Sequence, residues 1–203
     1  MTFPRPAHVR GRVRLQPTAR PQWTLTLDDA GRHHWSPLAP VARVAVELDK
    51  PRTSWSGEGY LDTNWGEEPL ESGFSGWHWA RGSTDQGTTV LYDTTPRSGA
   101  PLYTALTFDA TGGVSEATPP PPQPLSTALW GIKRRIPAAE GVTPRVLETL
   151  EDTPFYARSL VTTRVDGAEL KAVHESLNLD RFSRRWVQML LPFRMPRRRT
   201  PGA

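Results

Sequence analysis

The chain has 203 residues, of which 36% are hydrophobic, 23% charged and 9% aromatic. This balance is typical of a folded protein with one large or two small domains. The absence of cysteine excludes disulfides, thiolate zinc sites and cysteine nucleophiles. The formal net charge is +4, but residues 180–203 carry +6, so residues 1–179 carry −2. Because nucleic-acid binders more often spread basic residues over a folded face, we expect no nucleic-acid partner.

No stretch of the sequence predicts a membrane span or an export signal. Its apolar runs fall short of the roughly 20 residues that cross a bilayer. Residues 1–14 also lack the apolar centre of a secretory signal. We therefore expect a cytoplasmic protein.

Most of the chain predicts short β-strands. Its 21 prolines and 16 glycines are too many for a helical bundle. Apolar and polar residues alternate with a period of two in several segments, which predicts strands at residues 8–15, 23–27, 41–48, 76–81, 88–93, 102–109, 127–134, 157–165 and 169–179. Asp166 and Gly167 are a two-residue hairpin signal between the last two. This pattern predicts an all-β fold, an antiparallel barrel or sandwich.

Two stretches break the strand pattern. Residues 118–124 are nearly all proline and predict a polyproline II segment, either a stiff connector or a ligand for a proline-binding module. Residues 180–191 predict an amphipathic helix with Asp180 as its N-cap. Its apolar residues at helical spacing are Phe182, Trp186, Met189, Leu190 and Phe193.

Residues 55–71 form the densest cluster of unusual residues. If this segment is extended, Tyr60, Asp62 and Asn64 lie on one face of a strand. Burial among aromatic rings disfavours the charged form of a carboxylate. Such an aspartic acid can keep a proton near neutral pH and donate it. The alternative is a simple turn at residues 62–66, with Asp62 bonding its own backbone, and local sequence slightly favours the turn.

Two adjacent histidines, His33 and His34, precede Trp35. On a strand, His33 and Trp35 share one face and His34 lies on the other. Adjacent histidines are found in metal sites, but a third ligand at a recognisable spacing is missing. We expect no metal, and the alternative is that His33 is an ordinary polar residue at a loop edge.

Three glutamates beside Pro69 offer a further alternative. Glu67, Glu68 or Glu71 could form a glycosidase pair with Asp62, although spacing in sequence does not establish the required separation in space. A solvated acidic loop is the simpler interpretation of the three glutamates.

Several blocks resemble one known family. Residues 55–71, 74–81, 150–158, 174–182 and 186–197 are similar, in order, to the signature of bacterial carotenoid 1,2-hydratases, also called hydroxyneurosporene synthases. The resemblance covers essentially the whole chain. It implies a lipocalin-like β domain over residues 1–179, followed by a basic amphipathic helix and tail over residues 180–203. Family members are usually longer, and the chain resembles about their C-terminal half, so we expect the other half to be absent or separately encoded.

The resemblance also implies an activity. Family members are cofactor-independent hydro-lyases of carotenoid biosynthesis, typically in photosynthetic bacteria. They add water to the terminal C1=C2 bond of acyclic carotenes such as neurosporene and lycopene. The alternative function is a lipocalin-like binder that holds an apolar ligand without turnover.

The family's functional residues match positions in this chain. The resemblance implies Asp62 as the proton donor, with Tyr60, His33 and Trp35 beside it. Protonation of C2 leaves a tertiary cation at C1, which aromatic faces stabilise, and His33 would orient Asp62 or the attacking water. Independently of the family, we add Asn64 as a water-positioning candidate. A further substrate-positioning candidate is Trp65, where some relatives have histidine.

A carotene resides in membranes, and the C-terminal segment has the composition of an interfacial helix. Its candidate membrane-facing residues are Phe182, Trp186, Phe193, Arg197, Arg198 and Arg199. This predicts peripheral association with the inner membrane. The alternative is that the apolar stripe packs on the β domain while the arginines keep it soluble.

Overall fold

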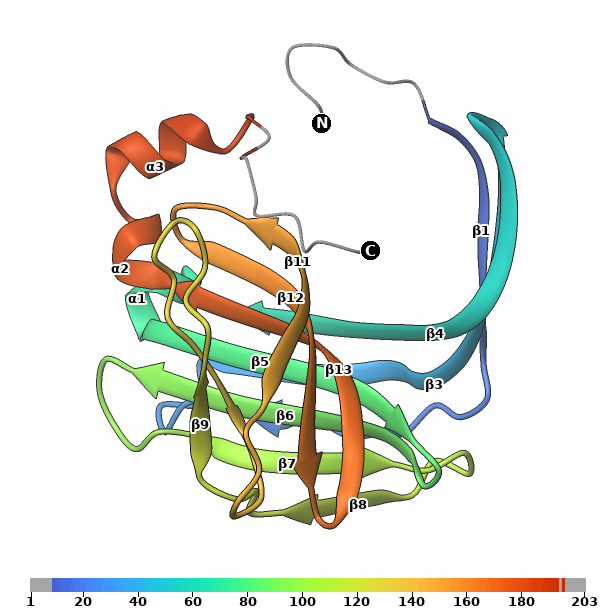
Figure 1. Cartoon of the computed structure of the whole chain (residues 1–203), viewed down its shortest axis with the longest axis horizontal. Helices are drawn as coiled ribbons and strands as arrows, with labels where there is room; N and C mark the ends of the chain where they lie inside the picture. Colours follow the sequence, from blue (N-terminus) through green and yellow to red (C-terminus); the bar gives the residue numbers. More distant parts are fainter. Residues whose placement is uncertain (1–8, 194, 196–203) are drawn as a thin grey trace.

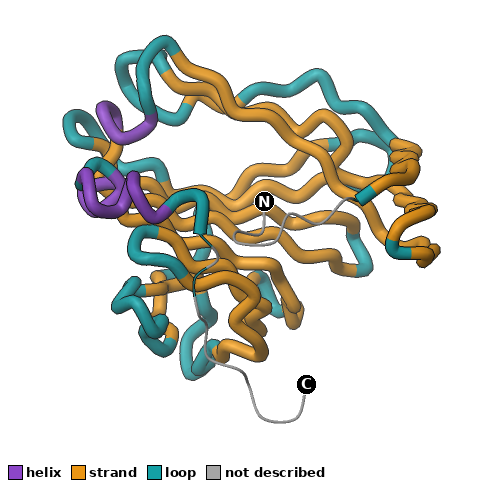
Figure 2. Tube along the Cα trace, turned by 90° about the horizontal axis from the view of Figure 1, so that it is seen from above, coloured by secondary structure: helices purple, strands orange, loops and turns teal. Residues whose placement is uncertain are grey.

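The computed structural model describes residues 9–193 and residue 195, and it is built mainly of antiparallel strands. The strands are β1 (Arg10–Pro17), β2 (Leu25–Thr26), β3 (His33–Lys50), β4 (Arg52–Gly66), β5 (Phe74–Thr84), β6 (Gly87–Pro96), β7 (Tyr103–Phe108), β8 (Val114–Ala117), β9 (Pro122–Leu125), β10 (Arg134–Pro137), β11 (Arg145–Asp152), β12 (Tyr156–Val165) and β13 (Ala168–Asn178). The helices are α1 (Leu70–Gly73), α2 (Leu179–Phe182) and α3 (Arg185–Leu190). Figure 2 shows the helices gathered at one end of the sheets.

The larger sheet has seven strands in the order β11-β12-β13-β5-β6-β7-β8, and all neighbours are antiparallel (Figure 1). Its β12–β13 hairpin turns at Asp166 and Gly167, which both have positive φ values of 51° and 78°. This confirms the predicted two-residue turn, because such turns require the left-handed region at both positions.

The smaller sheet is organised around the long strand β3. One edge of β3 pairs with β1 along its second half and with β2 near its start, while β4 covers the other edge along most of its length. Among the described strands, β4 pairs only with β3, so its outer edge is free. Figure 1 shows β1, β3 and β4 curving away from the larger sheet at their far end. We call this curved part of the three strands the arm.

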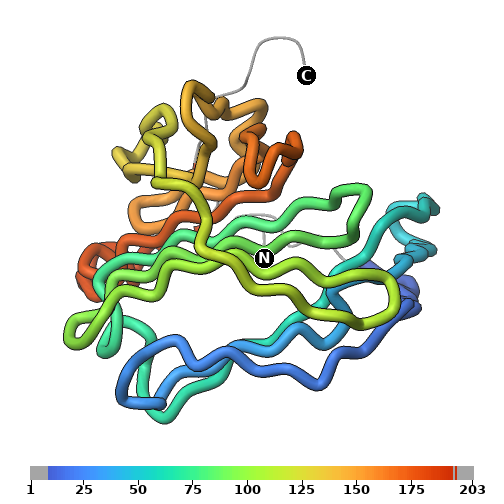
Figure 3. The backbone as a smooth tube through the Cα atoms, turned by 90° about the horizontal axis from the view of Figure 1, so that it is seen from below, coloured from blue at the N-terminus to red at the C-terminus, as the bar shows by residue number. Residues whose placement is uncertain are grey.

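The two sheets lie face to face, and β9 and β10 cover the opposite face of the larger sheet, as the layers of Figure 3 show. The described strands leave free edges at β1, β2 and β4 in the smaller sheet and at β8 and β11 in the larger one, so they form an open sandwich rather than one closed barrel. Between the sheets, the core is mainly aromatic, with Trp35, Phe74, Trp77, Tyr92 and Phe108 buried together. The predicted all-β, antiparallel class is confirmed.

A second buried cluster lies between the larger sheet and β10. His78 and His174 stack with ring centroids 6.1 Å apart, and Nε2 of His174 lies 2.8 Å from the carbonyl oxygen of Arg135. The Arg135 guanidinium in turn donates two hydrogen bonds to Asp93, of 2.6 and 2.7 Å. Burial, reinforced by the neighbouring positive charge, lowers the pKa of His78 to about 4. Burial also lowers the pKa of His174 to about 3, with His78 adding to the effect.

These two histidines predict a loss of stability in mild acid. The ordinary histidine pKa is 6.5, so the unfolded chain binds protons below that pH while both buried rings stay neutral down to about pH 4. The free energy of unfolding should therefore fall as the pH drops through this window, by up to about 1.4 kcal/mol per pH unit for each histidine. Urea unfolding at about pH 7 and about pH 5 measures the effect. His174→Gln should flatten the dependence, and an equally steep curve in that variant would contradict the assignment.

Three expectations about secondary structure are wrong. Residues 127–133 are a loop, because Ala128 and Ile132 are held together by a turn, and strand β10 begins only at Arg134. Residues 62–66 are not a turn but the end of β4, because they pair with the start of β3. The proline-rich segment is a connector only as far as residue 121, since Pro122–Leu125 forms β9 and pairs with β10.

The predicted C-terminal helix is divided into α2 and α3. The N-cap of α2 is Asn178, whose side chain accepts a hydrogen bond from the backbone N–H of Arg181, and not Asp180 as expected. The backbone of Arg184 is extended, with φ −78° and ψ 131°, and this breaks the helix. The two short helices therefore present their apolar residues in different directions. Arg197, Arg198 and Arg199 lie outside the described residues.

Candidate active site

A cavity of about 620 Å³ lies between the inner face of β4 and the larger sheet. Its aromatic wall comes from β5 and β6, through Trp77, Trp79 and Tyr92. Its polar groups come from several elements, and those on β4 include Asp62 and Asn64. The cavity thus combines an apolar lining with a few polar groups, as small-molecule sites usually do.

Asp62 is bound by two hydrogen-bond donors at the same oxygen. The indole N–H of Trp35 donates to Oδ2 over 2.7 Å, and the hydroxyl of Tyr60 donates to it over 2.9 Å. Among the described residues, no hydrogen bond reaches Oδ1. Because an indole N–H can only donate, a proton on this carboxyl group belongs on Oδ1.

The strand pairing explains how these side chains meet. Residues two apart on β4 share a face, which brings Tyr60, Asp62 and Asn64 together. In the ladder, Asn64 lies opposite Trp35, so the indole reaches diagonally to Asp62. The extended interpretation of this segment is therefore confirmed.

Aromatic rings surround this carboxylate. The Trp35 ring is fully buried and meets Tyr92 edge to face, with centroids 5.1 Å apart. The Tyr60 ring lies 5.7 Å from Trp79 on one side, and the guanidinium carbon of Arg81 lies 4.9 Å from its centroid. The rings place polarisable, apolar surface around the acid.

Both tyrosines of the cavity stay protonated over the ordinary pH range. Burial raises the pKa of Tyr60 far above its usual value, and the charge of Asp62 raises it further. Burial also raises the pKa of Tyr92, again reinforced by Asp62, although the side-chain amide of Asn64 partly opposes the rise. Tyr60 is therefore a permanent hydrogen-bond donor to the carboxylate.

His33 lines the same cavity but does not orient Asp62. Its Nδ1 lies 3.2 Å from Oδ2 of Asp28, whose Oδ1 accepts the backbone N–H groups of Arg32 and His33. Burial alone would raise the pKa of Asp28, but the hydrogen bonds from His33 and Arg32 outweigh it and lower that pKa. His33 pairs with Gly66, which lies four positions beyond Asp62, or about 13 Å along the strand.

Glycines make room for the His33 ring. A Cβ atom on Gly66 would lie 2.8 Å from ring carbon Cδ2, and one on Gly73 would lie 2.5 Å from Cε1. The ring also meets Phe74 edge to face at 5.0 Å. His33 is thus a buried side chain of β3, not a polar residue at a loop edge.

The other two predicted positioning residues lie at the rim of the cavity. Asn64 and Trp65 both line the cavity and are exposed. The Trp65 ring stacks on His34 at 5.4 Å, on the opposite face of the sheet from His33. The adjacent histidines therefore do not converge. Within residues 9–193 and 195, no group of three or more histidine and acidic side chains is placed to hold a metal ion.

Of the clustered glutamates, Glu68 reaches this cavity. Its carboxylate is 2.9 Å from the guanidinium of Arg32, so it is already paired with a cation. On the far side of the cavity, Arg158 and Glu175 form another ion pair of 3.0 Å. A glycosidase pair with Asp62 would require a free second carboxyl group, which these contacts do not favour.

The family comparison agrees with this arrangement. The model of the carotenoid hydratase CrtC family matches residues 1–202. The chain belongs to this family. Curated CrtC relatives are each named acyclic carotenoid 1,2-hydratase: the protein of Thiocapsa roseopersicina is 54% identical, that of Rubrivivax gelatinosus 44%, and that of Cereibacter sphaeroides 39%.

The matches cover nearly all of this CrtC-family chain but only part of the relatives. The match with the Thiocapsa protein covers 97% of this chain and 49% of that protein. For the Rubrivivax protein the shares are 96% and 48%, and for the Cereibacter protein they are 96% and 68%. The chain therefore spans about half the length of the first two relatives.

A solved structure supports the fold of the CrtC-family chain. The crystal structure of an AttH-type protein from Nitrosomonas europaea superimposes with a TM-score of 0.55 at 16% identity, covering 81% of this chain and 59% of the other. This likeness bears on architecture alone and agrees with a lipocalin-like arrangement of sheets.

The C-terminal residues of this CrtC-family chain divide into two groups. Phe182, expected to face a membrane, instead lies 4.9 Å from Phe155 and packs against the main core. Trp186 and Phe193 are exposed, as is Met189. None of the described helices is long and apolar enough to cross a bilayer.

Sequence patterns missed several residues of the site. The sequence around Asp28 is typical of a turn after a short strand, yet the Asp28 side chain contacts the His33 ring. Tyr92 was assigned only to a strand, and the Arg158–Glu175 pair comes from two strands of a hairpin. The period-two burial of β12 and β13 was the available signal for the ion pair, whereas β6 is buried along most of its length, and neither pattern reveals which face meets a cavity.

Proposed function

We propose that this chain catalyses, or supplies the catalytic residues for, the hydration of acyclic carotenes such as neurosporene and lycopene at the terminal C1=C2 bond. The observation that carries the proposal is the Asp62 carboxyl group, held at one oxygen by Trp35 and Tyr60 inside an aromatic cavity. Membership of the CrtC family, whose curated members act on such substrates by name, supports it.

In the proposed first step, Asp62 transfers the proton on Oδ1 to C2 of the alkene. The π-electron pair forms the new C2–H bond and leaves a tertiary cation at C1. The hydrogen bonds from Trp35 and Tyr60 to Oδ2 then stabilise the carboxylate. Hydrogen bonds to a charged group contribute about 1.5–3 kcal/mol each, so the two donors favour the charged product of this step.

In the second step, water attacks the cation at C1. A lone pair on oxygen forms the C–O bond, and the surplus proton returns to Asp62, which restores the acid. The faces of Tyr60 and Trp79, which both line the cavity, can stabilise the cation by about 0.5–2 kcal/mol each, whereas the fully buried Trp35 ring does not line it. Asn64, exposed at the rim beside Tyr92, would orient the incoming water.

Product analysis in labelled water tests this function. The purified chain is given lycopene in detergent micelles in ¹⁸O-labelled water, and the product is analysed by mass spectrometry. The proposal expects a 1-hydroxy carotene that carries one solvent oxygen. Lycopene binding with no labelled product would instead favour the alternative function, a binder of apolar ligands.

We further propose that α3 contacts a membrane surface, from which such a substrate must be drawn. Trp186 and Met189 are 51% and 74% exposed, although Val187 on the same helix is fully buried. Aromatic and apolar side chains on a surface helix insert into the lipid interface. Replacing Trp186 and Met189 with alanine should weaken binding to anionic vesicles by about tenfold.

A matched control removes exposed apolar side chains from another surface. Leu129 and Leu147 are 46% and 39% exposed and lie outside α3. Co-sedimentation of the Leu129→Ala/Leu147→Ala variant should equal that of the unmodified chain. An equal loss in both double variants would contradict docking through α3.

A further inference from the structure

A second cavity adjoins the one that contains Asp62. It has a volume of about 470 Å³ and shares four lining residues with the first: Tyr60, Leu61, Trp79 and Arg158. The two spaces are therefore adjacent and share the walls formed by these four side chains. Together they follow the free edge of β4 from Gly66 to Glu58, which is about 26 Å at a rise of roughly 3.3 Å per residue.

The two cavities differ in chemistry. The first holds polar groups at its far end, where His33, Glu68 and Asn64 lie. The additional wall of the second is aliphatic, formed by Val13, Leu15, Val44 and Val173 from β1, β3 and β13. An apolar chain would therefore extend from Asp62 toward this aliphatic wall, while water would occupy the polar end.

The charged groups near the second cavity already have partners. Glu58 accepts a hydrogen bond of 2.7 Å from the hydroxyl of Ser83. Arg81 lies over the Tyr60 ring, and Arg158 is paired with Glu175. An apolar ligand can therefore pass these side chains without leaving an unpaired charge.

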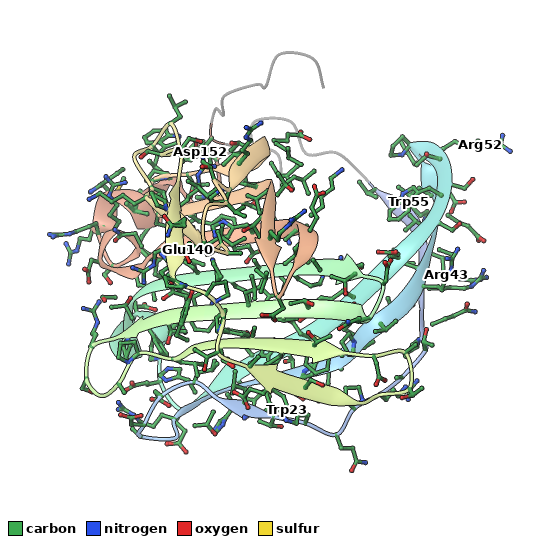
Figure 4. The ribbon with its side chains drawn as sticks, turned by 60° about the horizontal axis from the view of Figure 1, so that its bottom comes forward. Trp23, Arg43, Arg52, Trp55, Glu140 and Asp152 are labelled. Carbon is green, nitrogen blue, oxygen red and sulfur yellow. The ribbon has the colours of Figure 1, made fainter. Side chains whose placement is uncertain are left out.

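The apolar surface continues beyond the cavity onto the arm. In the register of the smaller sheet, Val13 lies beside Val46, and Val46 lies beside Trp55, so all three share a face. Val13 and Trp55 are 66% and 55% exposed. Figure 4 shows Trp55 on the inner side of the arm and Arg43 on its outer side. The arm therefore presents an apolar inner face that leads out of the second cavity.

We propose that the second cavity and the inner face of the arm hold the unreacted length of the polyene. The terminal alkene then lies at Asp62 and the conjugated chain runs past Tyr60 and Trp79 toward Val13. This inference rests on the proposed hydratase function. Its support is the wall that the two adjacent cavities share and the aliphatic character of the second wall.

Gly57 offers a way to fill this path without disturbing the fold. It lies opposite Val44 on the inner face of the arm, and a Cβ atom there would meet no other atom within 4 Å. Gly57→Trp therefore adds bulk to open space. The matched control is Ser56→Trp, since Ser56 is an exposed neighbour on the other face of β4.

A second pair of variants repeats the comparison with a charge on β1. Val13→Asp places the charge on the inner face of the arm. Its control is Gln16→Asp, because Gln16 points to the opposite face from Val13.

The test compares a long and a short substrate. Lycopene in detergent micelles and 2-methyl-2-heptene share the same terminal alkene, but only lycopene reaches the arm. Gly57→Trp and Val13→Asp should each lower the ratio of kcat/KM for lycopene to that for the short alkene by at least about tenfold. Ser56→Trp and Gln16→Asp should leave the ratio unchanged. Equal ratios in the inner-face variants and their controls would overturn the proposal.

A binding assay separates this inference from the proposed function. Lycopene binding, followed by quenching of tryptophan fluorescence, is measured in the Asp62→Asn background, where turnover is not required. Weaker binding in Val13→Asp than in Gln16→Asp supports the path even if the chain proves inactive. If both substrates are hydrated but Val13→Asp does not change lycopene binding, the hydratase function is supported and the proposed path is rejected.

Discussion

Asp62→Asn should remove hydration while leaving the fold intact. An amide cannot protonate an alkene, so kcat should fall by about 10²–10⁴-fold, the range that positioned acids contribute. The amide oxygen of asparagine can still accept the hydrogen bonds of Trp35 and Tyr60, since the two side chains have the same shape. The free energy of unfolding should therefore change by less than about 1 kcal/mol.

Two measurements check the Asp62 prediction. Chromatography of the carotene products reports turnover, and urea unfolding reports stability. Asp49→Asn makes the same chemical change at an exposed residue of β3 and should retain full activity. If kcat of Asp62→Asn stayed within tenfold of that of the unmodified chain, this result would contradict the role of Asp62 as the acid.

Trp35→Phe should reduce both stability and activity. The indole is fully buried against Tyr92, Phe108 and Trp23, so a smaller ring leaves a cavity that costs about 1–3 kcal/mol of unfolding free energy. The lost N–H also removes one of the two hydrogen bonds to Oδ2 of Asp62. A charge-assisted bond of about 2 kcal/mol corresponds to a fall in kcat of roughly 30-fold.

Tyr60→Phe is the matched comparison for Trp35→Phe. It deletes only the hydroxyl that donates to Asp62 and keeps the ring against Trp79. Its kcat should fall to a similar extent, with a smaller loss in the urea midpoint. Full activity in both variants would contradict a role for the paired hydrogen bonds in stabilising the carboxylate.

Local sequence patterns were sufficient to predict the strands that bury one face. The period of two located most strands because alternate residues face the core, as in β12 and β13. The pattern failed at residues 62–66, where glycine and asparagine favour a turn but pairing with the start of β3 imposes an extended chain. Tertiary pairing overrode local preference there.

The candidate site was predictable only in part, because its key contacts join distant segments. The face shared by Tyr60 and Asp62 followed from their spacing, and the resemblance supplied Trp35 and His33. The Trp35–Asp62 hydrogen bond depends on the register of β3 against β4, which no local pattern specifies. The Asp28–His33 contact depends likewise on the turn that joins β2 to β3.

The two carboxylate oxygens of Asp62 differ in their hydrogen bonds, and this difference predicts the stereochemistry of the proposed hydration. In the proposed hydration, with Oδ2 occupied by Trp35 and Tyr60, the transferable hydrogen would sit on Oδ1 and would approach the alkene from one side only. In heavy water, deuterium would then enter C2 with a single handedness, and the prochiral methylene of the alcohol would become a stereocentre of one configuration.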